Sequence, residues 1–64
     1  MKTGDRVTLL FCPEHPEAVG SMGTVVAVHR NLAGFLADVI EVRYEAMGKT
    51  HVMPFAPGNL RGIR

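Results

Sequence analysis

The stretches Gly4-Asp5-Arg6-Val7 and Gly20-Ser21-Met22-Gly23-Thr24-Val25 decide the fold of this 64-residue chain. The glycine and aspartate that begin the first stretch favour a turn into a β-strand. In the second stretch, Gly20 and Gly23 allow backbone bends that a residue with a Cβ atom tolerates poorly. Because residues 5–11 alternate between apolar and polar side chains and residues 23–29 form a strong β run, the two stretches predict the first two strands of a small β-domain.

The composition predicts one folded domain, residues 1–64. Hydrophobic residues make up 47% of the chain and charged residues 20%, a balance typical of globular domains rather than disordered segments. A core of this size contributes only about 3–5 kcal/mol, so we expect self-association to add burial. Seven Lys and Arg against six Asp and Glu give a net charge of +1, which differs from the strongly basic composition of dedicated nucleic-acid-binding domains.

Cysteine usage and hydropathy predict a cytoplasmic protein. Cys12 is the single cysteine, so no disulfide can form within the chain. No signal peptide is recognisable, and no apolar run approaches the ~18 residues of a membrane span. We therefore expect a protein of the reducing cytoplasm that has no membrane partner.

The apolar pattern at the start of the chain predicts a strand and a long loop. Residues 5–11 alternate in a way that places Val7, Leu9 and Phe11 on one face of a half-buried strand. Residues 11–22 are interrupted by prolines, so they predict a long first loop of defined shape.

A second strand and an insertion follow. Residues 23–29 predict a strand on which Val26 and Val28 point away from Val25 and form a candidate self-association surface. Residues 30–38 predict a turn or one helical turn inserted between strands, because a glycine interrupts their helical spacing. The apolar residues of this insertion are Leu32, Phe35 and Leu36.

Residues 39–55 predict a hairpin with one preferred register. If Glu45 pairs with Thr50 across the turn at residues 46–49, every apolar residue on one face meets an apolar or aromatic partner. A shift of one residue would move that set to the opposite face. Pro54 lacks an N–H donor and therefore marks the end of a strand or an edge of the sheet. The resulting pairs are Tyr44 with His51, Val42 with Met53 and Ile40 with Phe55.

The end of the chain completes the predicted fold. Residues 56–60 predict a 3₁₀ or tight turn, and residues 61–63 a closing strand. Five short strands, a long first loop and a short insertion between the second and third strands predict an all-β, five-stranded SH3-like barrel. We expect its core to contain Val7, Val25, Val42 and Phe55.

Turn and core residues along nearly the whole chain resemble KOW-type SH3-like domains, as in NusG-type transcription factors and one ribosomal protein family. They also resemble small phage- and plasmid-associated domains of unknown function. Members of the KOW group bind RNA or protein partners, so the resemblance implies a binding function. Residues 12–19 carry two acids and no Lys or Arg, a departure from an RNA-binding first loop. The matching residues are Gly4-Asp5-Arg6-Val7, Gly20, Gly23-Thr24-Val25, residues 39–44 and Asn59-Leu60.

A second resemblance is to the plasmid-borne type II dihydrofolate reductases, which are tetramers of SH3-like barrels. The early Gly-Asp-Arg-Val, the strand leading into a proline and the late Leu and Ile occur here in similar order. That family lines its pore with a Gln-Ile-Tyr run before the proline, whereas this chain has His51-Val52-Met53 before Pro54. The resemblance therefore implies oligomerisation and does not extend to the reductase activity.

Cys12 and His15 have the C-x-x-H spacing of half a metal site. A zinc site needs four ligands, or three and a water, and only His29 and His51 remain to supply them. Nothing in the sequence provides an orienting acid or an oxyanion hole for a Cys/His nucleophile pair. We therefore expect a loop cysteine, a surface histidine and a rim packing pair of His51 with Tyr44, and a protein that is not an enzyme and uses no metal or cofactor.

Two functions from different classes remain. The first is a non-enzymatic interaction module that binds a protein partner or a second copy of itself through apolar loops. The second is a KOW-like domain that binds RNA or DNA, weakly because the net charge is small. The candidate partner-binding residues are Phe11, His15, Leu32, Phe35 and Leu36, and the candidate nucleic-acid-binding residues are Arg30, Arg43 and Tyr44, while Arg6, Arg43 and Arg61 are a further set that could converge on a phosphate backbone.

Overall fold

The structure is a computed structural model that describes residues 1–30 and 38–63. The described part of the chain contains no helix long and apolar enough to cross a membrane. Its elements, in chain order, are β1 (Arg6–Leu9), the 3₁₀ turn η1 (Pro16–Ala18), β2 (Met22–His29), β3 (Val39–Ala46), β4 (Lys49–Phe55), the 3₁₀ turn η3 (Pro57–Asn59) and β5 (Leu60–Gly62).

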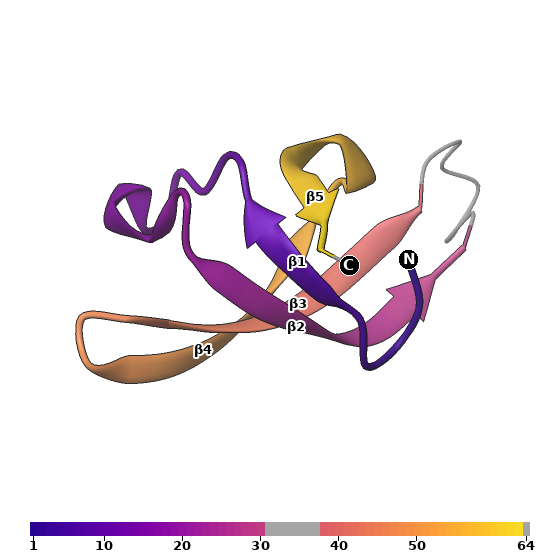
Figure 1. The fold of residues 1–64 in the computed structure, drawn as a ribbon, viewed down its shortest axis with the longest axis horizontal. Helices are drawn as coiled ribbons and strands as arrows, with labels where there is room; N and C mark the ends of the chain where they lie inside the picture. The colour runs from indigo at the N-terminus through magenta and orange to yellow at the C-terminus, as the bar shows by residue number, and fades with distance from the viewer. Residues whose placement is uncertain (31–37, 64) are drawn as a thin grey trace.

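The strands form one five-stranded antiparallel sheet in the order β4-β3-β2-β1-β5 (Figure 1). Consecutive strands from β1 to β4 are neighbours, and β5 returns to the free side of β1. The all-β class and the number of strands predicted from the sequence are confirmed. The two outer strands, β4 and β5, are not paired with each other, so the sheet is open.

The β3–β4 hairpin has the predicted register. Tyr44 lies opposite His51, Val42 opposite Met53 and Ile40 opposite Phe55. The turn between the strands places both Met47 and Gly48 at positive φ, 55° and 73°, as a two-residue hairpin loop that follows the right-handed twist of its strands requires. Pro54 lies on β4, an edge of the sheet, where its missing donor breaks no ladder hydrogen bond.

One apolar cluster forms the core beneath one face of the sheet. It includes the predicted residues Val7, Val25, Val42 and Phe55, which are at most 6% exposed. The described residues contain no buried charged side chain. The remaining members are Leu9, Cys12, Ala18, Ile40, Tyr44, Ala46 and Leu60, with Val28 and Met53 packed against them.

A β-bulge in β2 changes the predicted facing of Val28. Val25 pairs with Val42, but the next pair joins Ala27 to Glu41, so Val26 is an extra residue on β2. The extra residue shifts the alternation by one, which places Val28 opposite Ile40 and packs it against the core. The expectation that Val28 points away from Val25 is therefore wrong. Val26 is half-buried at the bulge itself.

Candidate functional site

Side-chain hydrogen bonds to Tyr44 of β3 hold the first loop, residues 10–21, against the sheet. The Cys12 thiol donates to the Tyr44 hydroxyl oxygen at 3.5 Å. The Tyr44 hydroxyl can then donate to Nδ1 of His15, 2.8 Å away. The phenol therefore accepts one hydrogen bond and donates another. Cys12 is buried and His15 is half-buried, so the histidine expected at the surface is partly covered, and both residues anchor the loop to Tyr44.

The rings of His15 and His51 lie above each other at the rim of the core. Their centroids are 4.2 Å apart, and His51 is also 5.6 Å from the ring of Tyr44. The expected packing of His51 on Tyr44 is confirmed. Nε2 of His51 lies 3.2 Å from the carbonyl oxygen of Ala46. Within residues 1–30 and 38–63, no group of three or more His, Cys, Asp or Glu side chains could hold a metal ion, and His29 lies beside Glu41 at 3.6 Å instead.

Main-chain hydrogen bonds fix both ends of the first loop, on which Leu10 and Phe11 are exposed. The Leu10 N–H donates to the Asn59 carbonyl at 2.8 Å, and the Gly20 N–H donates to the Leu9 carbonyl at 2.8 Å. Because β1 ends at Leu9, the alternation stops before Phe11, which is 55% exposed. The expectation that Phe11 shares a strand face with Val7 and Leu9 is wrong.

Phe11 lies at the edge of a hollow of about 130 Å³ between the first loop and β4. One wall comes from the first loop and the other from the end of β4 and the turn that follows. Leu10, next to Phe11, is 47% exposed. We define the first-loop surface as Leu10 together with the residues that line this hollow: Phe11, Cys12, Pro13, Glu14, Met53, Pro54, Phe55, Ala56 and Asn59.

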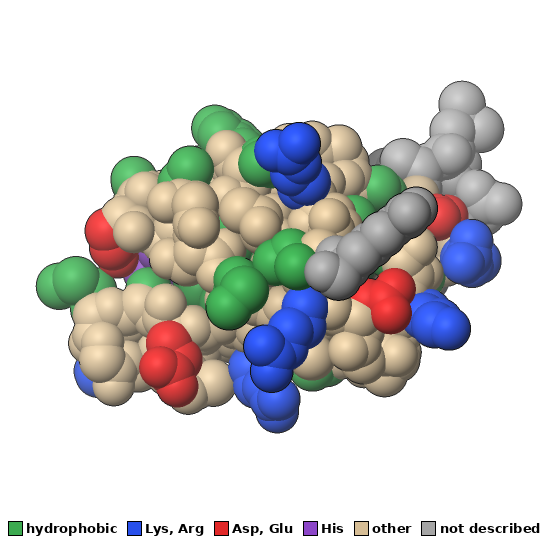
Figure 2. Space-filling model, in the orientation of Figure 1, with side chains coloured by type: hydrophobic (Ala, Val, Ile, Leu, Met, Phe, Trp, Pro, Cys, Tyr) green, Lys and Arg blue, Asp and Glu red, His purple; other side chains and the backbone are tan. Residues whose placement is uncertain are grey.

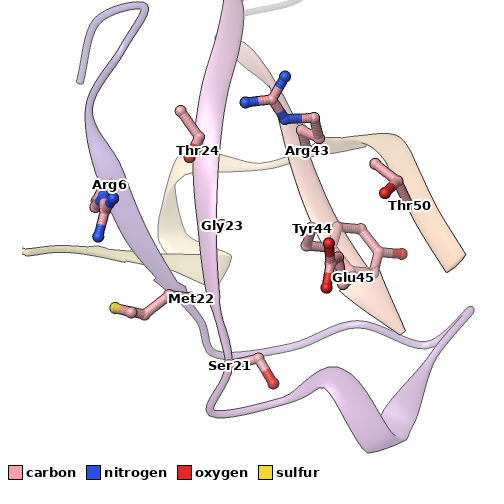
Figure 3. A pocket seen from close by; sticks show the side chains of 9 residues that line it. All are labelled: Arg6, Ser21, Met22, Gly23, Thr24, Arg43, Tyr44, Glu45 and Thr50. Carbon is pink, nitrogen blue, oxygen red and sulfur yellow. The ribbon is translucent and has the colours of Figure 1, made fainter. Parts of the chain in front are cut away.

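A wider and shallower depression of about 840 Å³ lies on the face of the sheet away from the core. The strand register places Arg6, Thr24 and Arg43 in one row across β1, β2 and β3, and Figure 3 shows their side chains around the depression. Among the described residues, neither arginine forms an ion pair. We define the arginine face as Arg6, Met22, Thr24, Arg43 and the exposed Val52, which is paired with Arg43.

The structure does not bring together the predicted nucleic-acid residues. Tyr44 is 2% exposed, so its ring is not available to a base. Arg30 lies beyond the end of β2 and pairs with Asp38 at 3.7 Å, whereas Arg43 lies on the arginine face. Arg61 is on β5, opposite Thr8. Of the further set predicted from the sequence, Arg6 and Arg43 do lie in one row, whereas the Thr24 that joins them was not predicted, because the row depends on the register of three strands.

The first loop and the two residues that flank the insertion, Arg30 and Asp38, lie at opposite ends of β3. η1 packs near Tyr44 and the β3–β4 turn, while Arg30 and Asp38, which flank the insertion, lie beside the other end of β3 (Figure 1). The sequence also predicts a working surface between the first loop and the insertion, and this prediction rests on residues 31–37, outside the described residues. The predicted contact residues Leu32, Phe35 and Leu36 lie outside the described residues.

The chain matches no protein-family model, no curated protein and no solved structure.

The anchor at Tyr44 makes stability sensitive to alkaline pH. Burial raises the pKa of Tyr44, the only tyrosine, above its ordinary value of about 10. The folded state then holds a proton that the unfolded state releases, so stability is complete below about pH 10 and falls as the pH rises towards the folded-state pKa.

We expect denaturant unfolding to show this loss in the wild type and not in Tyr44→Phe. At about pH 8 the variant should be less stable by about 1–2 kcal/mol, because Cys12 and His15 lose their partner. An equally steep alkaline loss in Tyr44→Phe would show that another group causes it.

Proposed function

We propose that this protein is a non-enzymatic interaction module that binds another protein surface through the first-loop surface. The observation that supports the proposal is the exposure of Phe11 and Leu10, 55% and 47%, beside a hollow of about 130 Å³. A bulky aromatic side chain next to a pocket is the kind of residue that contributes most to protein interfaces. The core does not use Phe11, so its exposure has no benefit for the isolated domain.

The strand order supports an SH3-like arrangement as part of this proposal. A meander from β1 to β4, a 3₁₀ turn and a short β5 that returns to β1 is the connectivity expected from the sequence for such a domain. In this interpretation the two edges of the sheet curve towards each other over the core. Small β-domains of this kind place binding residues on loops that a rigid sheet positions. The proposed place of action is the cytoplasm.

Phe11→Ser tests the proposal without disturbing the core. We expect its melting temperature to stay within about 2 °C of the wild type, because the substituted side chain is mostly exposed. Proteins captured from the native host by the wild-type chain should be lost, at least tenfold, with the variant. Met47→Ser is the matched control, because Met47 is 79% exposed and lies outside the first-loop surface. Equal capture by Phe11→Ser and the wild type would refute the proposal.

A second candidate function is nucleic-acid binding by the arginine face. The observation that favours it is that Arg6 and Arg43 flank Thr24 without an ion pair among the described residues. Strands in a sheet lie about 4.8 Å apart, so the two arginines begin roughly 10 Å from each other. Two guanidinium groups at that separation can contact neighbouring phosphates of one strand.

We expect any such binding to be weak and to vanish as salt rises, because few counterions are released. Titration of a labelled single-stranded RNA or DNA measures it. Arg43→Gln should lower the slope of log affinity against log salt by about one, and Arg30→Gln, the paired control, should leave it unchanged. Submicromolar binding at about 150 mM salt would make nucleic-acid binding the leading function.

A further inference from the structure

The net charge of the chain is only +1, but the described structure has one acidic surface and one basic surface. The first loop carries Glu14 and Glu17, both exposed, and no Lys or Arg. Neither carboxylate forms an ion pair within residues 1–30 and 38–63. The arginine face carries Arg6 and Arg43, both exposed. Its depression is also lined by one acid, Glu45, which leaves an excess of positive charge there.

Each charged surface also carries apolar side chains. Leu10 and Phe11 accompany the acids of the first loop, and Met22 and Val52 accompany the arginines. Figure 2 shows hydrophobic side chains next to Lys or Arg side chains over β1 and β2. The two surfaces are therefore complementary both in charge and in apolar character, which is the combination that gives protein interfaces their specificity.

We propose that the first-loop surface of one molecule docks on the arginine face of a second copy of this chain. This inference rests on the proposed function and names the partner. No residue of the described part of the chain lines both depressions, so one molecule can use both surfaces at once. A contact between two different surfaces is heterologous and builds closed rings or open chains rather than a two-fold dimer.

Association is favourable for this chain because a domain of 64 residues buries little apolar surface alone. In the complex, Phe11 would be buried from water against the apolar part of the arginine face. Glu14 would approach the row of Arg6 and Arg43. Carboxylate–guanidinium pairs of this kind are partly screened by salt. The association is therefore salt-sensitive but retains an apolar contribution from Phe11.

Sedimentation velocity tests the inference with charge-reversed chains. We expect the wild type to sediment as species larger than its 7.0 kDa monomer at ~0.1 M NaCl, and to shift towards the monomer at ~1 M NaCl, where the Debye length is about 3 Å. The double variants Glu14→Lys/Glu17→Lys and Arg6→Glu/Arg43→Glu should each be monomeric. All four residues are exposed, so the variants should keep the wild-type melting temperature.

An equimolar mixture of the two double variants should associate again, because the reversed loop of one matches the reversed face of the other. Lys49→Glu is the control, since Lys49 is exposed and belongs to neither surface. A mixture that stays monomeric, or double variants that associate like the wild type, would overturn the inference.

The outcomes separate this inference from the function on which it rests. If Phe11→Ser abolishes association while both charge-reversed variants associate normally, the first-loop surface is still a binding surface. The arginine face is then not the surface that it binds, and the inference is wrong. A wild type that is monomeric at high micromolar concentration overturns the inference, and Phe11-dependent capture of another protein would still support the proposed function. If Arg6→Glu/Arg43→Glu loses only RNA binding, the arginine face serves nucleic acid and the inference is wrong.

Discussion

Gly23→Ala is expected to destabilise the protein by about 3 kcal/mol, most of the stability available to so small a domain. A Cβ atom at this position would lie 2.5 Å from Cγ1 of Val42 and 3.0 Å from the carbonyl oxygen of Arg43. The carbonyl belongs to the neighbouring strand β3, so the backbone of the sheet would have to move. Position 23 therefore requires glycine because there is no space for a Cβ atom, and not because its backbone has a positive φ.

Denaturant unfolding and circular dichroism measure this effect. Gly58→Ala is the matched control, because a Cβ atom there would have no neighbour within 4 Å. The control should change the free energy of unfolding by less than about 1 kcal/mol. A Gly23→Ala protein as stable as the wild type would mean that β2 and β3 do not pack at the described distance.

Val42→Ala is expected to cost about 1–3 kcal/mol of the free energy of unfolding, through lost burial and a residual cavity. Val42 is fully buried at the centre of the sheet, between Val25 on β2 and Met53 on β4. The change can unfold a large part of the population, because the whole domain has only about 3–5 kcal/mol of stability. An unchanged melting temperature would show that Val42 is not in the core.

The two substitutions should not be additive. Removing Cγ1 of Val42 opens space for the Cβ atom of an alanine at position 23, whereas the contact with the Arg43 carbonyl remains. We therefore expect the double variant to be more stable than the sum of the two single effects predicts, by about 1 kcal/mol. Additive effects would indicate that the Gly23 clash is with the backbone alone.

Local patterns predicted the β3–β4 hairpin correctly. Its strands are close in the chain, and alternation on both strands allows one register that pairs Val42 with Met53. The bulge at Val26 was not predictable from the same alternation, because a run of β-branched residues fits either face. The consequence was that Val28 was assigned to the wrong face.

The candidate site was less predictable than the fold because it depends on contacts between distant residues. Tyr44 hydrogen-bonds Cys12 and His15, which are 32 and 29 positions away, and no local pattern in the first loop indicates this anchor. Phe11 was identified as a contact residue from its loop position, yet its outward direction follows from the end of β1 at Leu9. Arg6 and Arg43 were predicted together as candidates for contact with a phosphate backbone, but their row through Thr24 required the register of three strands.

Site-specific photo-crosslinking at position 11 tests the central claim, that the first-loop surface is where this protein contacts another. A benzophenone analogue of phenylalanine, which adds a benzoyl group to the ring, replaces the exposed Phe11, and the same analogue at the exposed Met47 is the control. We predict that irradiation in the native host gives a protein adduct at position 11, either a second copy or another protein, and at least tenfold less at position 47. An adduct at position 47 with none at position 11, or a nucleic-acid adduct alone, would contradict the account.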